Sequence, residues 1–142
     1  MLSIAHSLTG AFIASKLPNP ALYVPLSLAA HYAEDYLPHW DVGTGIGTGK
    51  RKRSTAFFWE IFDLLISLAL IYLFFGISNY HVWIGAFFCL LPDFLEAPRT
   101  FLKLNLLPPL SWLHKHLHTS VPNMFWGLLP QVLLVTLIYF LR

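Results

Sequence analysis

Long apolar segments with few charges are the feature that most restricts how this chain can fold. Residues 55–75 and 121–141 are each about as long as the ~20 residues that cross a bilayer as a helix. Charged residues make up only 11% of the 142 residues, whereas soluble domains average about 25%. Such a chain has too little polar surface for a water-soluble globule, so the sequence predicts an integral membrane protein.

Prolines and glycines divide the chain into further helical segments. Residues 1–41 predict a hairpin of two short helices, and residues 55–96 predict a transmembrane hairpin. Residues 97–119 mix cationic, proline and leucine residues and predict an interfacial segment, which precedes a last span over residues 120–142. The expected fold is one all-α membrane domain, a polytopic bundle of four to five helices with a short interfacial helical segment.

Residues 42–54, VGTGIGTGKRKRS, form a glycine-rich basic loop between the two hairpins. The phosphate-loop pattern G-x-x-x-x-G-K-[ST] is not met, because Thr44 stands at the first glycine and Arg51 follows Lys50. Most lysines and arginines lie in this loop and in residues 97–119, so the positive-inside rule places both segments and the N-terminus in the cytoplasm. The net charge of +2 is too small to predict nucleic-acid binding.

Acidic and histidine side chains gather at the cytoplasmic ends of the predicted helices. Ionisable groups at membrane depth are costly and usually face the bundle interior, so they indicate a functional site. The pairs His31–Asp35 and His114–His118 are spaced i,i+4, which places each pair on one helix face. Imidazole and carboxylate together suit one or two divalent ions, with zinc preferred over manganese or iron. The joint clustering of these side chains at one end of the bundle therefore predicts a metal site there.

Other polar residues near these positions have separate assignments. His39 and Asp41 follow a proline turn, and the sequence leaves open whether they are ligands or loop residues. We expect Glu34 to face water, because it is one residue away from the His31–Asp35 face. His116 points away from its two histidine neighbours and is expected at the interface. The candidate general bases are Glu60, Asp63 and Glu96.

Four short motifs resemble those of the membrane-bound metal-dependent hydrolases of the LexA-binding, inner-membrane-associated type. They are AHSLTGA at 5–11, HYAED at 31–35, LLPDFLE at 90–96 and HKHLHTS at 114–120. Their order differs from that of the family, and Glu96 stands where the family has a histidine. The resemblance implies a hydrolase of the prokaryotic cytoplasmic membrane, with Glu60 or Asp63 as substitutes at a second ion. It also implies that the metal ligands are His6, His31, Asp35, Asp93, His114 and His118.

These patterns predict a metal-dependent hydrolase that acts at the cytoplasmic interface on a phosphoester or ester of a lipid-like substrate. The ion would activate water, and the basic residues 50–53 would attract an anionic head group. Membrane lipid and this substrate are the expected partners, without nucleic acid. One alternative is a metal-binding, transport or structural membrane protein without turnover. A third hypothesis is a membrane adaptor whose His/Asp cluster is only a hydrogen-bonded polar core.

Overall fold

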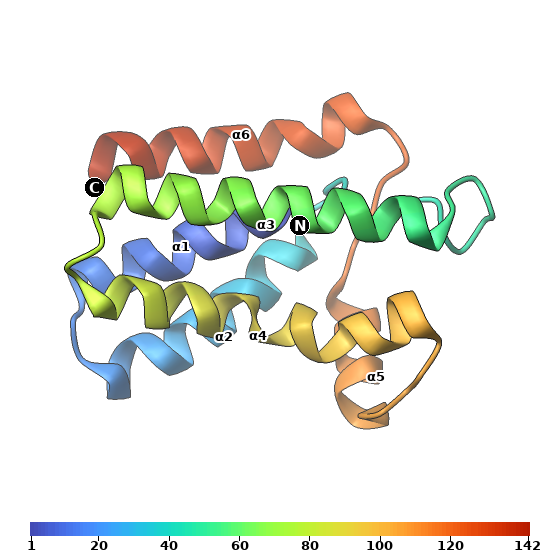
Figure 1. Ribbon diagram of the computed structural model, residues 1–142, viewed down its shortest axis with the longest axis horizontal. Coiled ribbons are helices and arrows are strands. Elements are labelled where there is room, and N and C mark those ends of the chain that lie inside the picture. The colour runs from blue at the N-terminus through green and yellow to red at the C-terminus, as the bar shows by residue number, and fades with distance from the viewer.

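The computed structural model describes residues 1–142. It contains six α-helices joined by loops and no β-strand (Figure 1). Helix α1 packs against α2, α3, α4 and α6 and is therefore the central helix. The expected all-α class is confirmed. The helices are α1 (Ser3–Lys16), α2 (Pro20–Tyr36), α3 (Arg53–Phe75), α4 (Tyr80–Leu102), α5 (Pro108–Leu117) and α6 (Met124–Leu141).

Helix α4 is longer than the sequence predicted. Pro92 and Pro98 lie inside it, and it ends at Leu102, followed by Lys103 in the left-handed conformation with a φ of 62°. A proline removes one backbone donor and bends a helix, but the surrounding turns can continue. The expected interfacial segment, 97–119, is therefore divided between the end of α4, a short connection and α5 (Figure 1).

Two glycines allow α1 and α4 to cross with their backbones in direct contact. A Cβ atom on Gly10 would lie 2.7 Å from the Cβ of Cys89, and one on Gly85 would lie 2.6 Å from the Cβ of Ala14. Both distances are shorter than real Cβ contacts, so these positions have room for hydrogen only. Small residues are a common way to bring apolar helices close together. The crossing fixes the position of His6, one turn earlier on α1, relative to α4.

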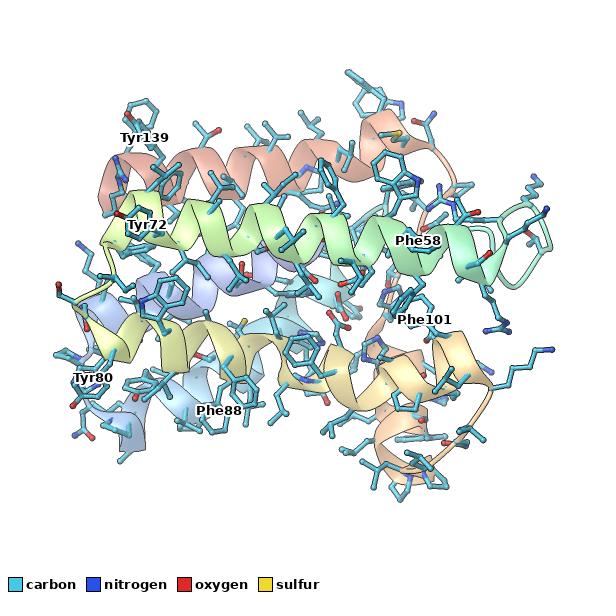
Figure 2. All side chains as sticks on the ribbon, in the orientation of Figure 1. Phe58, Tyr72, Tyr80, Phe88, Phe101 and Tyr139 are labelled. Carbon is cyan, nitrogen blue, oxygen red and sulfur yellow. The ribbon has the colours of Figure 1, made fainter.

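Helices α3 and α6 are long and apolar enough to cross a membrane. Only 17% of the most apolar 18-residue window of each helix is buried, whereas the apolar helix of a soluble core would be mostly covered. Figure 2 shows the labelled Tyr139 of α6 directed away from the bundle, and Phe58 and Tyr72 of α3 are also exposed. The other four helices do not meet the same criterion of length and hydropathy.

We expect Gly10→Leu to destabilise the fold, because its side chain would meet the backbone of Gly85, which can move only if α1 and α4 separate. Overpacking of this kind costs about 1–3 kcal/mol. The free energy of unfolding in detergent micelles measures the loss. Gly47→Leu is the matched control, because a Cβ at Gly47 meets no atom within 4 Å. Equal stability of the two variants would contradict the close crossing.

Candidate metal centre

A cluster of buried imidazole and carboxylate groups lies where α1, α2, α4 and α5 meet. Figure 2 shows nitrogen and oxygen atoms gathered between α3 and α4 near the middle of the molecule. All six predicted ligands belong to the cluster. Its members are His6 from α1, His31 and Asp35 from α2, His39 and Asp41 from the loop after α2, Asp93 from α4, His114 from α5, and His118 directly after α5.

The first part of the cluster, the His31 group, consists of His31, Asp35, Asp93 and His114. Each residue offers one ligand atom, and these atoms all lie within 4.8 Å of one another. The Oδ2 atom of Asp35 lies 3.3 Å from Nε2 of His31 and 3.7 Å from Nε2 of His114. The Oδ1 atom of Asp93 lies 3.9 and 3.8 Å from the same two nitrogens.

Several of these atoms are buried without a hydrogen-bond partner. They include both ring nitrogens of His31 and the Oδ2 atom of Asp35. An unpaired buried polar group costs about 1–3 kcal/mol, and a charged one costs more. A divalent cation between Nε2 of His31 and the carboxylates would remove this cost for the atoms that face it, so the donor set fits a metal ion.

His6 lies at the edge of the His31 group. Its Nε2 atom is 3.1 Å from Oδ1 of Asp35 and 3.8 Å from Oδ2 of Asp93. The amino group of Met1 forms an ion pair with Asp35 and lies 3.0 Å from the same nitrogen of His6. On the other side of the ring, Nδ1 is 2.7 Å from Oε2 of Glu34.

The position of Glu34 differs from the expectation that it faces water. Its side chain is buried because α2 packs against α1 at this point. A carboxylate beside the far nitrogen of a histidine orients the ring and makes the other nitrogen a better metal ligand. Glu34 is therefore suited to position His6, a role that helical periodicity on α2 alone did not indicate.

The second part of the cluster, the His39 group, consists of His39, Asp41 and His118 beside Asp35. The Nε2 atoms of His39 and His118 are 3.0 Å apart. The Oδ2 atom of Asp41 lies 3.2 Å from Nε2 of His118 and 3.5 Å from Nε2 of His39. The structure thus brings into the cluster both loop residues whose role the sequence left open.

Backbone hydrogen bonds join the end of α2 and the loop after it to the segment after α5, and they set the position of the His39 group. The amide of His39 donates to the carbonyl of Thr119 (3.1 Å), and the amide of Thr119 donates to the carbonyl of Asp35 (2.9 Å). The amide of Val121 donates to the carbonyl of His39 (2.7 Å). In such an extended segment, residues two apart face the same side. The spacing of His39 and Asp41 was the one signal in the sequence for their shared orientation.

The protonation states of His39, His114 and Asp41 suit metal ligands. Burial lowers the pKa of His39 and of His114, so both rings are neutral at pH 7. Burial alone would raise the pKa of Asp41, but the neighbouring imidazoles of His118 and His39 hold that pKa well below its usual range. Neutral imidazoles and ionised carboxylates are the forms that bind divalent ions.

The three candidate bases lie outside the cluster and are engaged in other contacts. The amide of Ser3 donates to Oδ2 of Asp63 (2.5 Å), and its hydroxyl donates to Oε1 of Glu60 (2.5 Å). These carboxylates thereby satisfy donors at the first turn of α1. The hydroxyl of Ser111 donates to Oε2 of Glu96 (2.7 Å). Neither Glu60 nor Asp63 belongs to a group of side chains that could hold a metal ion.

A cavity of about 730 Å³ opens beside the cluster. Glu60 and Glu96 line it, so both carboxylates can reach a substrate held there. His116 has no part in it: its ring is exposed and Nδ1 lies 2.7 Å from the carbonyl of Trp112. The cluster residues that line the cavity are Asp41, Asp93, His114 and His118.

No protein-family model, curated protein or solved structure matches this chain. The resemblance of its motifs to the membrane-bound metal-dependent hydrolases therefore stays a prediction. The chemistry of the site is inferred from its own geometry: two groups of buried nitrogen and oxygen ligands that share one aspartate and open to a cavity.

We expect zinc to raise the thermal unfolding midpoint of the protein, because an ion that binds only the folded state adds about 2.7 kcal/mol at 100 times its Kd. His31→Gln should reduce this increase, since it removes a ligand from the His31 group. His116→Gln is the control and should respond as the wild type does. The same zinc-induced shift in all three proteins would contradict metal binding by this group.

Proposed function

We propose that this protein is a membrane-embedded, metal-dependent hydrolase that cleaves a phosphoester or ester of a lipid-like substrate at the cytoplasmic interface. The observation that carries the proposal is the buried ligand cluster at the base of a cavity with both cationic and apolar walls. Histidine and carboxylate ligands suit zinc, with manganese and iron as alternatives.

The outward faces of α3 and α6 support the membrane location. Side chains such as Phe58 and Phe140 are 71% and 76% exposed, and exposed apolar surface of this extent is typical of contact with lipid or another protein. With α1, α2 and α4, these helices would form the polytopic bundle of four to five helices, and α5 the interfacial segment. The basic loop and α5 lie at one end of α3, and the turn at 76–79 lies at the other (Figure 1).

The cavity has room for both parts of an amphipathic substrate. Arg53, Arg99 and Lys115 line it near the cluster and would attract an anionic head group. Phe57 and Ile61 of α3 form part of its apolar wall, and each is more than 40% exposed. An acyl chain could therefore lie along α3 while the ester or phosphoester reaches the metal ligands.

A divalent ion in the His31 group would polarise the substrate and lower the pKa of a bound water. Asp93 and His114 face both the ion site and the cavity, so they would hold the ion where the substrate arrives. Glu60 also lines the cavity and has one hydrogen bond, from Ser3. We assign Glu60 as the group that accepts a proton from the attacking water.

The apolar interior of the bundle, away from the cluster, favours hydrolysis over transport. A transporter needs polar groups along the whole path through the membrane. Beyond the cluster, the interior between α1, α3, α4 and α6 is closed by apolar side chains. They are Leu8, Ala11, Ile71, Val82, Ala86 and Ile138.

Hydrolysis of a chromogenic phosphodiester and of a short-chain ester, both in detergent micelles, tests the proposal. We expect turnover that a chelator abolishes and added zinc or manganese restores. Asp93→Asn should lower kcat by more than about 100-fold, since even outer partners of metal ligands are worth 10–100-fold. His116→Gln should keep full activity. Zinc-loaded, folded protein without turnover of either substrate would overturn the enzymatic part of the proposal.

We expect Lys115→Gln to raise KM for an anionic phosphodiester several-fold and to leave KM for an uncharged ester unchanged. The reason is that Lys115 lines the cavity and attracts negative charge. Lys103→Gln is the matched control, because Lys103 lies outside the cavity. The KM difference should shrink at high salt, which screens exposed charges. An equal effect on both substrates would contradict the head-group role.

A further inference from the structure

We propose that the centre holds two divalent ions, the second bound by His39, Asp41 and His118 and joined to the first through the carboxylate of Asp35. This inference rests on the metal site of the proposed function, but it concerns ion number and ligand set and can be tested without turnover. Its basis is a count of protons and lone pairs in the His39 group.

His39 directs an unprotonated nitrogen into the group. Its Nδ1 atom lies 2.8 Å from the carbonyl oxygen of Leu37, which can only accept, so Nδ1 carries the proton. In a neutral ring, Nε2 is then a lone-pair acceptor. That atom faces Nε2 of His118 at 3.0 Å, Oδ2 of Asp41 at 3.5 Å and Oδ1 of Asp35 at 3.7 Å. This use of a backbone carbonyl is the common way to orient a metal-binding histidine.

The protons available cannot satisfy the acceptors. The one candidate donor is Nε2 of His118, which lies 3.0 Å from Nε2 of His39 and 3.2 Å from Oδ2 of Asp41. A single proton there can serve only one of them well. Asp41 is 8% exposed, and its Oδ2 atom has no hydrogen-bond partner. A bound cation is the arrangement that satisfies all of these atoms together.

The opposite oxygen of Asp41 is already fixed. Its Oδ1 atom accepts a hydrogen bond from the hydroxyl of Thr44 at 3.2 Å, so the carboxylate is oriented with Oδ2 toward the two histidines. Oriented carboxylates are typical of metal sites, where neighbouring groups hold the ligands in place.

Helix α6 holds the backbone between the two loop ligands. The amide of Trp40 donates to the carbonyl of Gly127 (3.1 Å), and the amide group of Gln131 donates to the carbonyl of Trp40 (2.8 Å). A Cβ atom on Gly127 would lie 2.5 Å from that of Trp40, so only glycine allows this approach. His39 and Asp41, on either side of Trp40, are thereby held rigidly at the cluster.

Asp35 is placed to bridge the two groups. Its Oδ2 atom faces His31 at 3.3 Å and His114 at 3.7 Å, whereas its Oδ1 atom faces His6 at 3.1 Å and His39 at 3.7 Å. The amino group of Met1 also pairs with Oδ1, and an ion bound at this oxygen would replace it. One carboxylate thus directs a separate oxygen to each ligand group. Carboxylates that bridge in this manner hold two ions about 3.5–4 Å apart.

Two ions narrow the substrate class. A pair of ions stabilises both the attacking and the leaving oxygen of an in-line displacement at phosphorus. Both groups reach the cavity, the first through Asp93 and His114 and the second through Asp41 and His118. A phosphate group in the cavity could therefore contact both ions, which favours a phosphoester over a carboxylic ester.

Metal content by elemental analysis, after saturation with zinc and removal of free ions, tests the inference. We expect two zinc ions per chain in the wild type and in the His116→Gln control, and one in His39→Gln. Asp41→Asn, which keeps the hydrogen bond with Thr44, is a second variant with the same expected loss. His31→Gln should lose the other ion. Circular dichroism establishes that each variant is folded before it is measured.

Manganese gives an independent signal. Two manganese ions bridged by Asp35 are magnetically coupled, so the electron paramagnetic resonance spectrum of the wild type should be that of a coupled pair. His39→Gln should give the spectrum of an isolated ion. One ion per chain in the wild type, or two in folded His39→Gln and Asp41→Asn, would overturn the inference. A one-ion protein with turnover would leave the proposed function standing, and a two-ion protein without turnover would overturn only the function.

Discussion

The buried carboxylate of Asp35 is the group on which the arrangement of this protein depends. It lies between histidines from α1, α2, α5 and the loop after α2, and its own helix supplies only one of them. A buried charge is costly unless it is paired and fully hydrogen-bonded. The elements around Asp35 therefore have to converge closely on it, and the resulting groups of imidazole and carboxylate atoms could hold a metal ion.

Close helix packing makes this convergence possible. The contact between Gly10 and Gly85 removes side chains from the α1–α4 crossing, which leaves His6 level with Asp93. On the other side of the cluster, Gly127 gives α6 the same close approach to the loop at Trp40. Helix pairs with little polar surface gain their stability from such packing, and here the packing also positions the ligands.

The division of the molecule into an apolar half and a polar half is consistent with chemistry at a membrane surface. The apolar half is closed, and the polar half opens to a cavity with cationic and apolar walls. A hydrolase for an anionic, lipid-like phosphoester needs an apolar surface that binds the acyl chain. It also needs positive charge that binds the phosphate.

The sequence by itself determined the helical class, the two helices long and apolar enough to cross a membrane, and most of the residues that could bind metal. Apolar length and the i,i+4 spacing of His31 and Asp35 suffice for this, since a helix places such residues on one face regardless of its neighbours. The tertiary structure decided the positions of His39, Asp41 and Glu34. Loop residues have no periodicity of their own, and the His39 group forms only because backbone hydrogen bonds join segments about 80 positions apart in the chain. The burial of Glu34 likewise follows from the packing of α2 against α1, which no local pattern in α2 encodes.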